Sequence, residues 1–179
     1  MKKITSVCII MFIVLLSGCG TTQPDIPTVK TTKYFNIKNV SLHLTQKVKT
    51  DIVYHTQKEL QELLKNDIEK KLADKNLLSN DASMTKLVID VSYTRHFVGD
   101  ATPMSSDSLA YPNMNYTIKA YDGKKLLTTI EKKDLTYQGG FAMNLQVIAG
   151  TLRDKKYELD FINALANTIV NNIEEIHNQ

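Results

Sequence analysis

Apolar and polar residues alternate along four segments of this chain. Alternation with a period of two is typical of a half-buried strand, because successive side chains point to opposite faces of a sheet. In the clearest of these segments, Leu87, Ile89 and Val91 lie on one side. The four predicted strands are 34–44, 86–98, 114–121 and 125–137, and residues 51–55 are a less regular candidate.

Two connections between these strands differ sharply in character. Asp122-Gly123 separates the last two strands and predicts a hairpin with a type I′ turn, in which both central residues have positive φ. Residues 99–113 form a polar connection of about fifteen residues, longer than most loops in compact domains. Because long loops often carry function, this segment is a candidate interaction site.

Two further segments have apolar residues at helical spacing. Thr56, with Glu59 three positions later, predicts a capping box at the start of a helix that ends near Asn76. A second helix is predicted from Lys155 to Ile176. The predicted buried stripes are Leu60, Leu63, Leu64, Ile68 and Leu72 in the first, and Leu159, Ile162, Leu165, Ala166, Ile169, Ile173 and Ile176 in the second. We interpret both stripes as core-facing surfaces rather than partner-binding ones.

The predicted order is strand, helix, strand, strand, strand, helix. It favours an α+β fold of two layers, with both helices on one face of a mainly antiparallel four-stranded sheet. A right-handed crossover through the first helix makes the first two strands parallel if they share the sheet. The apolar stretch from Phe141 to Ile148 is compatible with a docked loop, a short strand or a helical turn.

The start of the chain has a different composition. Lys2 and Lys3 precede an apolar run that ends in Leu16-Ser17-Gly18-Cys19, which resembles the lipobox of a bacterial lipoprotein signal. The resemblance implies cleavage between Gly18 and Cys19, a diacylglycerol on the Cys19 sulfur and an acyl chain, such as palmitate, on the new amine. Two or more acyl chains give a stable anchor without a transmembrane helix.

This interpretation divides the chain into three parts. Residues 1–18 are the signal peptide, 19–33 are the lipidated cysteine and a flexible tether, and 34–179 are one α+β domain. Gly20 follows the lipidated cysteine, and an Asp at that position typically retains lipoproteins at the inner membrane. By the same resemblance, Gly20 favours the outer membrane, facing the periplasm, in a host with two membranes.

Composition narrows the chemistry that the domain can perform. The net charge is +3, and removal of Lys2 and Lys3 with the signal lowers it to +1, so nothing indicates a nucleic-acid partner. The two cysteines are Cys8 and Cys19, so the predicted domain has no disulfide and no thiolate for catalysis or metal binding.

No motif in the sequence indicates a catalytic or cofactor site. The four histidines have no metal-ligand spacing, and Gly139-Gly140 lacks the Lys and Ser/Thr of a phosphate-binding loop. His96, beside Arg95 and near Asp100, is the best candidate for a polar site, but we favour a strand-end histidine facing water, because nothing nearby completes a charge relay. We therefore predict a protein that is not an enzyme and binds neither metal nor cofactor.

The layout of the mature domain also resembles small bacterial envelope lipoproteins of a domain-of-unknown-function family. The residues that carry the likeness are Leu87-Val88-Ile89-Asp90-Val91 before a long loop, Asp122-Gly123-Lys124 between paired strands, Gly139-Gly140, and Ala164-Leu165-Ala166 in the closing helix. The resemblance implies an α+β domain and no established activity or site.

Two functional hypotheses follow. The first is a membrane-anchored lipoprotein that binds or supports another envelope protein or assembly, through Met104, Leu109 and Tyr111 of the long loop and through Phe141 and Met143. Self-packing of these apolar residues is the competing interpretation. The alternative hypothesis is an accessory lipoprotein that holds a small apolar or lipid ligand between sheet and helices, which requires a cavity of about 300 Å³ or more.

Overall fold

The computed structural model describes residues 31–137 and 139–177, which form four strands and three helices. In chain order these are β1 (Phe35–Gln46), α2 (Gln57–Asp74), β2 (Thr85–Arg95), β3 (Asn113–Asp122), β4 (Lys125–Thr136), α3 (Phe141–Ile148) and α4 (Tyr157–His177). The predicted order of strands and long helices is confirmed, and the helix α3 is added to it. The predicted signal peptide, lipobox and lipidated Cys19 lie outside the described residues.

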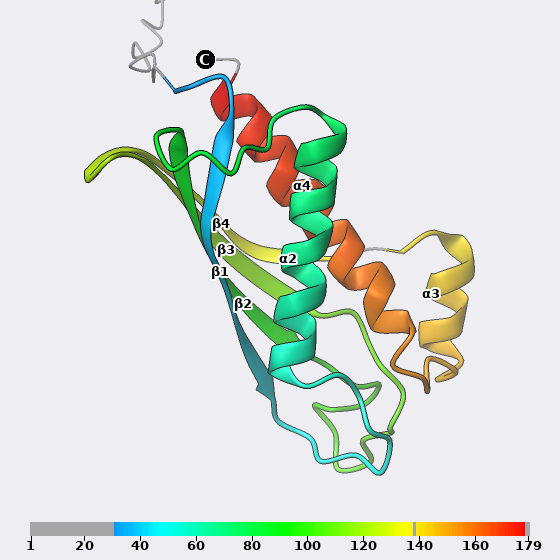
Figure 1. Cartoon of the computed structure of the whole chain (residues 1–179). Coiled ribbons are helices and arrows are strands. Elements are labelled where there is room, and N and C mark those ends of the chain that lie inside the picture. Colours follow the sequence, from blue (N-terminus) through cyan, green and yellow to red (C-terminus); the bar gives the residue numbers. More distant parts are fainter. Residues whose placement is uncertain (1–30, 138, 178–179) are drawn as a thin grey trace, which may run out of the picture.

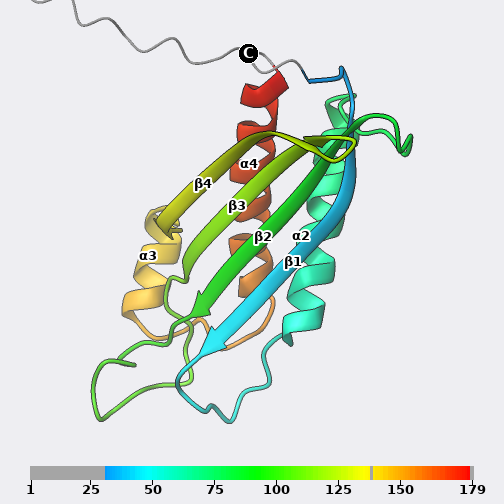
Figure 2. The ribbon, with the colours of Figure 1, turned by 90° about the vertical axis from the view of Figure 1, so that its left-hand side faces the viewer.

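The strands form one sheet in the order β1-β2-β3-β4, in which β1 and β2 are parallel and the other neighbours are antiparallel. Both long helices, α2 and α4, cover the same face of this sheet (Figure 1). The opposite face is free of helices and is turned toward the viewer in Figure 2. The α+β, two-layer architecture predicted from the sequence is therefore confirmed, together with the parallel pairing of the first two strands.

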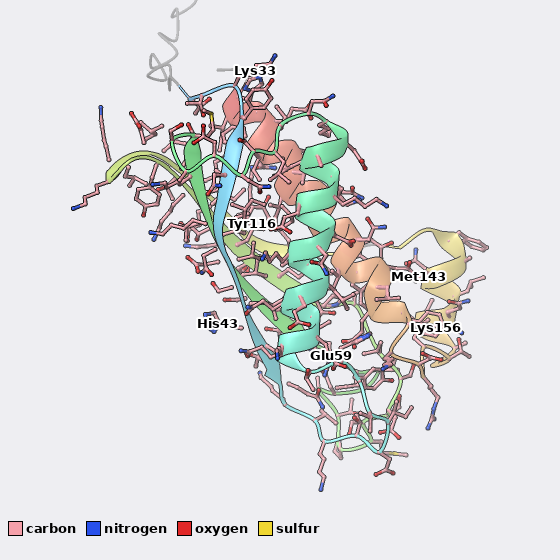
Figure 3. The ribbon with its side chains drawn as sticks, in the orientation of Figure 1. Lys33, His43, Glu59, Tyr116, Met143 and Lys156 are labelled. Carbon is pink, nitrogen blue, oxygen red and sulfur yellow. The ribbon has the colours of Figure 1, made fainter. Side chains whose placement is uncertain are left out.

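The hydrophobic core lies between the sheet and the two long helices. It includes Leu60, Leu64, Ile68 and Leu72 of α2, Leu87, Ile89, Val91 and Tyr93 of β2, and Ile162, Leu165, Ile169 and Ile173 of α4, all of them buried. Thr56 caps α2, and the reciprocal bonds of the predicted capping box with Glu59 are both present. Figure 3 shows Tyr116 inside this layer, whereas His43 projects from the open face of the sheet.

The β3–β4 hairpin is confirmed, but its predicted turn type is wrong. Asp122 pairs with Lys125, so the two central residues of the turn are Gly123 and Lys124. Gly123 has a φ of 56°, whereas Lys124 is not among the described residues with positive φ. Positive φ at the first central position alone is the requirement of a type II′ turn. The segment 51–55, a less regular strand candidate, forms no strand.

The buried face of α4 differs from the predicted stripe at its first turn. Leu159 is 43% exposed, while the neighbouring Glu158 is fully buried. The remaining predicted positions of the stripe are buried, so the helical period was correct and only its first member was wrong. Burial of Glu158 is possible because an arginine of β2 pairs with its carboxylate.

Candidate interaction surface

The helix α3 carries the most exposed apolar side chains of the domain's second half. Phe141 and Ile148 are each 80% exposed and Leu145 is 50% exposed. Their spacing of four and three residues places them on one side of the helix. No residue of α3 is buried, so the segment is an amphipathic helix attached to the outside of the fold rather than part of its core.

The opposite side of α3 attaches the helix to the domain. Met143 and Val147 are partly buried against the hydrophobic core. The hydroxyl of Tyr111 donates a hydrogen bond to Oδ1 of Asn144. The ring of Tyr111 also packs edge-on against those of Tyr137 and Phe161, with ring centroids 6.1 and 6.3 Å away. These contacts fix which side of α3 faces outward.

A glycine permits the close approach of α3. A Cβ atom at Gly139 would lie 2.7 Å from both Cβ and Sδ of Met143, a distance that real Cβ contacts do not reach. Gly140, the N-cap of α3, has open space around it. Gly139 therefore provides the room that the Met143 side chain occupies.

Two further large apolar side chains are exposed on the loops at the end of the sheet where β1 and β2 finish. Val53 is 83% exposed and Met104 is 87% exposed. The two loops are joined to each other, because the backbone N–H of Asp51 donates to the Asp107 carboxylate over 3.3 Å. We call the side chains of Val53, Met104, Phe141, Leu145 and Ile148 the distal apolar surface.

The residues predicted for an interaction surface therefore separate into two groups. Met104 and Phe141 are exposed, as a surface role requires. Leu109 is buried, with 1% exposure, because its segment pairs with Phe97 and Leu152 inside the fold. Tyr111 and Met143 are half-buried and hold α3 in place. Assigning Leu109 to the surface was wrong. The sequence did not single out Val53, whereas Leu145 and Ile148 belong to the apolar stretch Phe141–Ile148 that it did indicate.

The candidate polar site at the end of β2 is only partly assembled. Nδ1 of His96 lies 2.6 Å from a carboxylate oxygen of Asp100, and both side chains are about one quarter exposed. Arg95 points to the opposite face of the sheet, where it is buried. Asp107 is joined to Arg153 and to the 51–54 loop instead. Within the part of the chain that the structure describes, His96 and Asp100 thus form a pair without the third group of a charge relay.

The buried side of β2 contains a charged cluster that the sequence analysis missed. The Nε atom of Arg95 donates to Oε1 of Glu158 over 2.7 Å. His55 contributes its backbone N–H and its ring Nδ1, each 3.0 Å from Oε2 of the same carboxylate. The signal in the sequence was the position of Glu158, which lies three and four residues before Phe161 and Ile162 on the apolar side of its helix.

A tyrosine beside this cluster has a raised pKa. Burial, aided by the negative charges of Glu158 and Asp107, raises the pKa of Tyr54 to about 12. The Tyr54 hydroxyl donates toward the backbone carbonyls of Asp107 and Leu152. The cluster joins the 51–56 segment, β2 and the start of α4, and its groups already satisfy one another. We interpret it as structural.

Three observations limit the chemistry of the described residues. No group of three or more His, Cys, Asp or Glu side chains in 31–137 and 139–177 is placed to hold a metal ion. None of the described helices has the length and apolar character to cross a bilayer. The pocket between β4 and α4, lined by Met114, Leu135 and Leu165 among others, measures about 150 Å³.

Comparison with known proteins yields likenesses of shape only. No family model and no curated protein sequence matches this chain. Similar solved structures include a minor lipoprotein of Acinetobacter baumannii (16% identity, TM-score 0.39, covering 79% of this chain and 91% of that one). A DUF330 protein of Xanthomonas campestris has 6% identity and a TM-score of 0.42, with coverage of 82% and 85%. A homologue of a neuraminyllactose-binding hemagglutinin from Helicobacter pylori has 11% identity and a TM-score of 0.35, with coverage of 84% and 94%. These identities and scores are too low to assign a family or a site.

Proposed function

We propose that this chain is a bacterial lipoprotein without enzymatic activity, held in the cell envelope by a lipid on Cys19. We further propose that its distal apolar surface binds another envelope protein. The observation that carries the second part is the outward stripe of Phe141, Leu145 and Ile148, on a helix whose other side is attached to the domain by specific contacts. Exposed apolar side chains gathered on one side of a helix are typical of a binding surface.

The anchor rests on the sequence of the signal region. A basic start, a short apolar run and Leu16-Ser17-Gly18-Cys19 occur in the order that lipoprotein processing requires. Gly20 supports a location at the outer membrane, facing the periplasm, in a host with two membranes. We also propose that the chain belongs to a domain-of-unknown-function family of small envelope lipoproteins.

The charge of α3 favours a protein partner over the bilayer surface. Helices that lie in the membrane interface usually carry Lys and Arg on their polar face. Residues 141–150 contain no charged residue, and the only polar side chains of α3 are those of Asn144 and Gln146. An uncharged amphipathic helix of this kind is suited to an apolar groove on another protein, where no ion needs to be desolvated.

The volume of the pocket between β4 and α4 argues against an internal lipid ligand at that position. A pocket for a small apolar molecule usually has a volume of at least about 300 Å³. The pocket between β4 and α4 reaches about 150 Å³. A ligand in that position would have to push the helix layer away from the sheet, which disfavours a lipid site between β4 and α4.

Photocrosslinking in intact cells tests the proposed partner. A photoreactive amino acid at Phe141 or Ile148 should give a crosslinked adduct with a defined envelope protein. The matched control is the same amino acid at His43, which is exposed on the open face of the sheet. Equal adducts from all three positions, or adducts with lipid alone, would contradict the proposal.

A separate experiment tests the anchor. The mass of the mature protein extracted from membranes should exceed that of residues 19–179 by the mass of the lipid groups. A Cys19→Ala variant should leave the membrane fraction. A variant that stays there, with an unmodified mass and normal retention, would refute the lipid anchor without affecting the crosslinking result.

A further inference from the structure

Three lysines surround a pocket on the open face of the sheet. The pocket has a volume of about 270 Å³, and Lys38, Lys86 and Lys124 line it together with the ring of Tyr121. It lies on the side of the sheet that no helix covers (Figure 2). Nothing in the proposed protein-binding function uses this pocket, which is formed by β1, β2 and the β3–β4 turn.

The fold brings these side chains together from three separate segments. Lys86 of β2 lies directly opposite Tyr121 of β3 in the antiparallel register. The register between β1 and β2 shifts between Ile37 and Asn39, so Lys38 is the extra residue of a β-bulge. Bulges redirect side chains, and here the bulged lysine lines the same pocket as Lys86.

The third lysine comes from the hairpin turn. The β3–β4 hairpin curves away from the helix layer and extends beyond the open face of the sheet (Figure 1). Lys124, in the turn itself, thereby faces the same pocket as the lysines of β1 and β2. Gly123, with its positive φ of 56°, is the residue that allows this turn.

The charges in the pocket are not balanced by ion pairs. The ion pairs that lysines form within the described residues involve Lys58, Lys65, Lys75, Lys133 and Lys156. None of these lysines lines the pocket. Three lysines around one cavity provide the positive charge and the donors that an anion with several acceptor oxygens requires.

We propose that this pocket binds the phosphate group of an anionic phospholipid in the membrane that carries the lipid anchor. The inference rests on the proposed anchoring through Cys19. Thr32 and Thr85 exchange two hydrogen bonds, from the backbone N–H of each to the hydroxyl of the other, over 3.0 and 2.8 Å. Thr32 is thus attached at Thr85, and the next residue, Lys86, lines the pocket. The segment that leads back to Cys19 therefore starts beside the pocket.

The length of the tether keeps this end of the domain near the bilayer. Cys19 precedes Thr32 by 13 positions, and a chain segment of that length spans at most about 45 Å in any conformation. In Figure 3, Lys33, the residue after Thr32, lies at one end of the molecule, away from Met143 of α3 and from Lys156. The pocket therefore faces the headgroup region while α3 remains available to a partner.

A titration with two phosphate sources tests the proposal. The mature chain in neutral detergent micelles is titrated with phosphatidylglycerol and, separately, with inorganic phosphate. The backbone amide signals of residues 85–88 and 121 report binding by NMR. Phosphatidylglycerol should shift these signals saturably at concentrations where inorganic phosphate does not. This readout does not require a lipid on Cys19, so a failure of the proposed anchor leaves it interpretable.

Substitutions then identify the pocket. A Lys38→Gln, Lys124→Gln variant should bind phosphatidylglycerol about 25-fold more weakly, at about fivefold for each lysine near an anionic surface. The control is Lys47→Gln, Lys49→Gln, which removes two exposed lysines of the loop after β1 and should change affinity less than about twofold. Equal losses in both variants, no shift with phosphatidylglycerol, or equally tight binding of inorganic phosphate would each overturn the proposal.

Discussion

Arg95 and Glu158 form an ion pair inside the domain, with the Arg95 Nε atom 2.7 Å from Oε1 of Glu158. Glu158 is fully buried and Arg95 is 5% exposed. The remaining donors of the guanidinium reach Oε1 of Gln46 and the carbonyl oxygen of His55, each over 2.6 Å. The pair therefore ties the first turn of α4 to the ends of β1 and β2 and to the segment that leads into α2.

Removing the charge of Glu158 should destabilise the domain strongly. In a Glu158→Gln variant the buried Arg95 guanidinium loses its counter-ion, and breaking a buried pair in this way costs about 3–5 kcal/mol of unfolding free energy. Urea denaturation measures the loss. The control is Asp160→Asn, an exposed carboxylate in the same helical turn, which should change the free energy by less than about 0.5 kcal/mol. Similar losses in both variants would contradict the structural role of the pair.

The same pair shows why part of this structure could be predicted from the sequence and part could not. Strands and long helices followed from periodicity, because each has one face in the core and burial selects apolar residues there. The sequence pattern predicts a buried Leu159 and an exposed Glu158, but the structure has the opposite arrangement, because Arg95 of β2 pairs with the Glu158 carboxylate inside the fold. Pairings between residues 63 positions apart leave no local pattern.

The candidate surface was predictable to a similar degree. The apolar stretch containing Phe141 was recognised, but its conformation and its outward side depend on contacts with Tyr111 and the core, which no periodicity over eight residues can specify. Leu109 was misassigned because a buried residue within a polar loop has the same local sequence as an exposed one. The lysine pocket needed the β-bulge at Lys38, which is a property of strand pairing.

Stability should fall in alkaline solution because burial raises the pKa of several tyrosines in the folded state, among them Tyr54, Tyr93 and Tyr116. Burial raises the pKa of both Tyr54 and Tyr116 from the ordinary 10.0 to about 12 in the folded state, aided by the charge of Glu158 near Tyr54 and of Glu175 near Tyr116. As the pH rises, these tyrosines ionise in the unfolded chain before they ionise in the folded one. The stability that depends on their protonated form is therefore complete below pH 10 and is lost as the pH rises toward 12. Urea midpoints measured from pH 8 to 11.5 should therefore decrease above pH 10.

Phenylalanine substitutions separate this titration from general alkaline damage. Tyr54→Phe and Tyr116→Phe should each reduce the slope of stability against pH above pH 10. Within the described residues the Tyr116 hydroxyl has no hydrogen-bond partner, so Tyr116→Phe should not lower stability at pH 7. Tyr54→Phe should cost about 1 kcal/mol there, because it loses the bonds to the Asp107 and Leu152 carbonyls. Unchanged slopes in both variants would assign the alkaline loss to other groups.

The two glycines before α3 should differ in their tolerance of alanine. Gly139→Ala places a Cβ atom 2.7 Å from Met143, so the helix must move outward, at a cost of about 1–3 kcal/mol. Gly140→Ala meets no atom within 4 Å and should be nearly neutral. Amide hydrogen exchange over residues 141–148 should accelerate in the first variant alone. Equal exchange in both would show that Met143 does not hold α3.

The outward and inward sides of α3 should separate binding from stability. Phe141→Ser with Ile148→Ser removes two side chains that are each 80% exposed, so urea stability should change by less than about 0.5 kcal/mol. The yield of the crosslinked partner from a photoreactive residue at Leu145 should fall at least tenfold if the stripe supplies the binding energy. Met143→Ser should instead lower stability by about 1–2 kcal/mol, because this side chain is partly buried against the core. A double variant that keeps its full crosslinking yield would exclude α3 as the binding surface, since its fold would be intact and only its outward side chains changed.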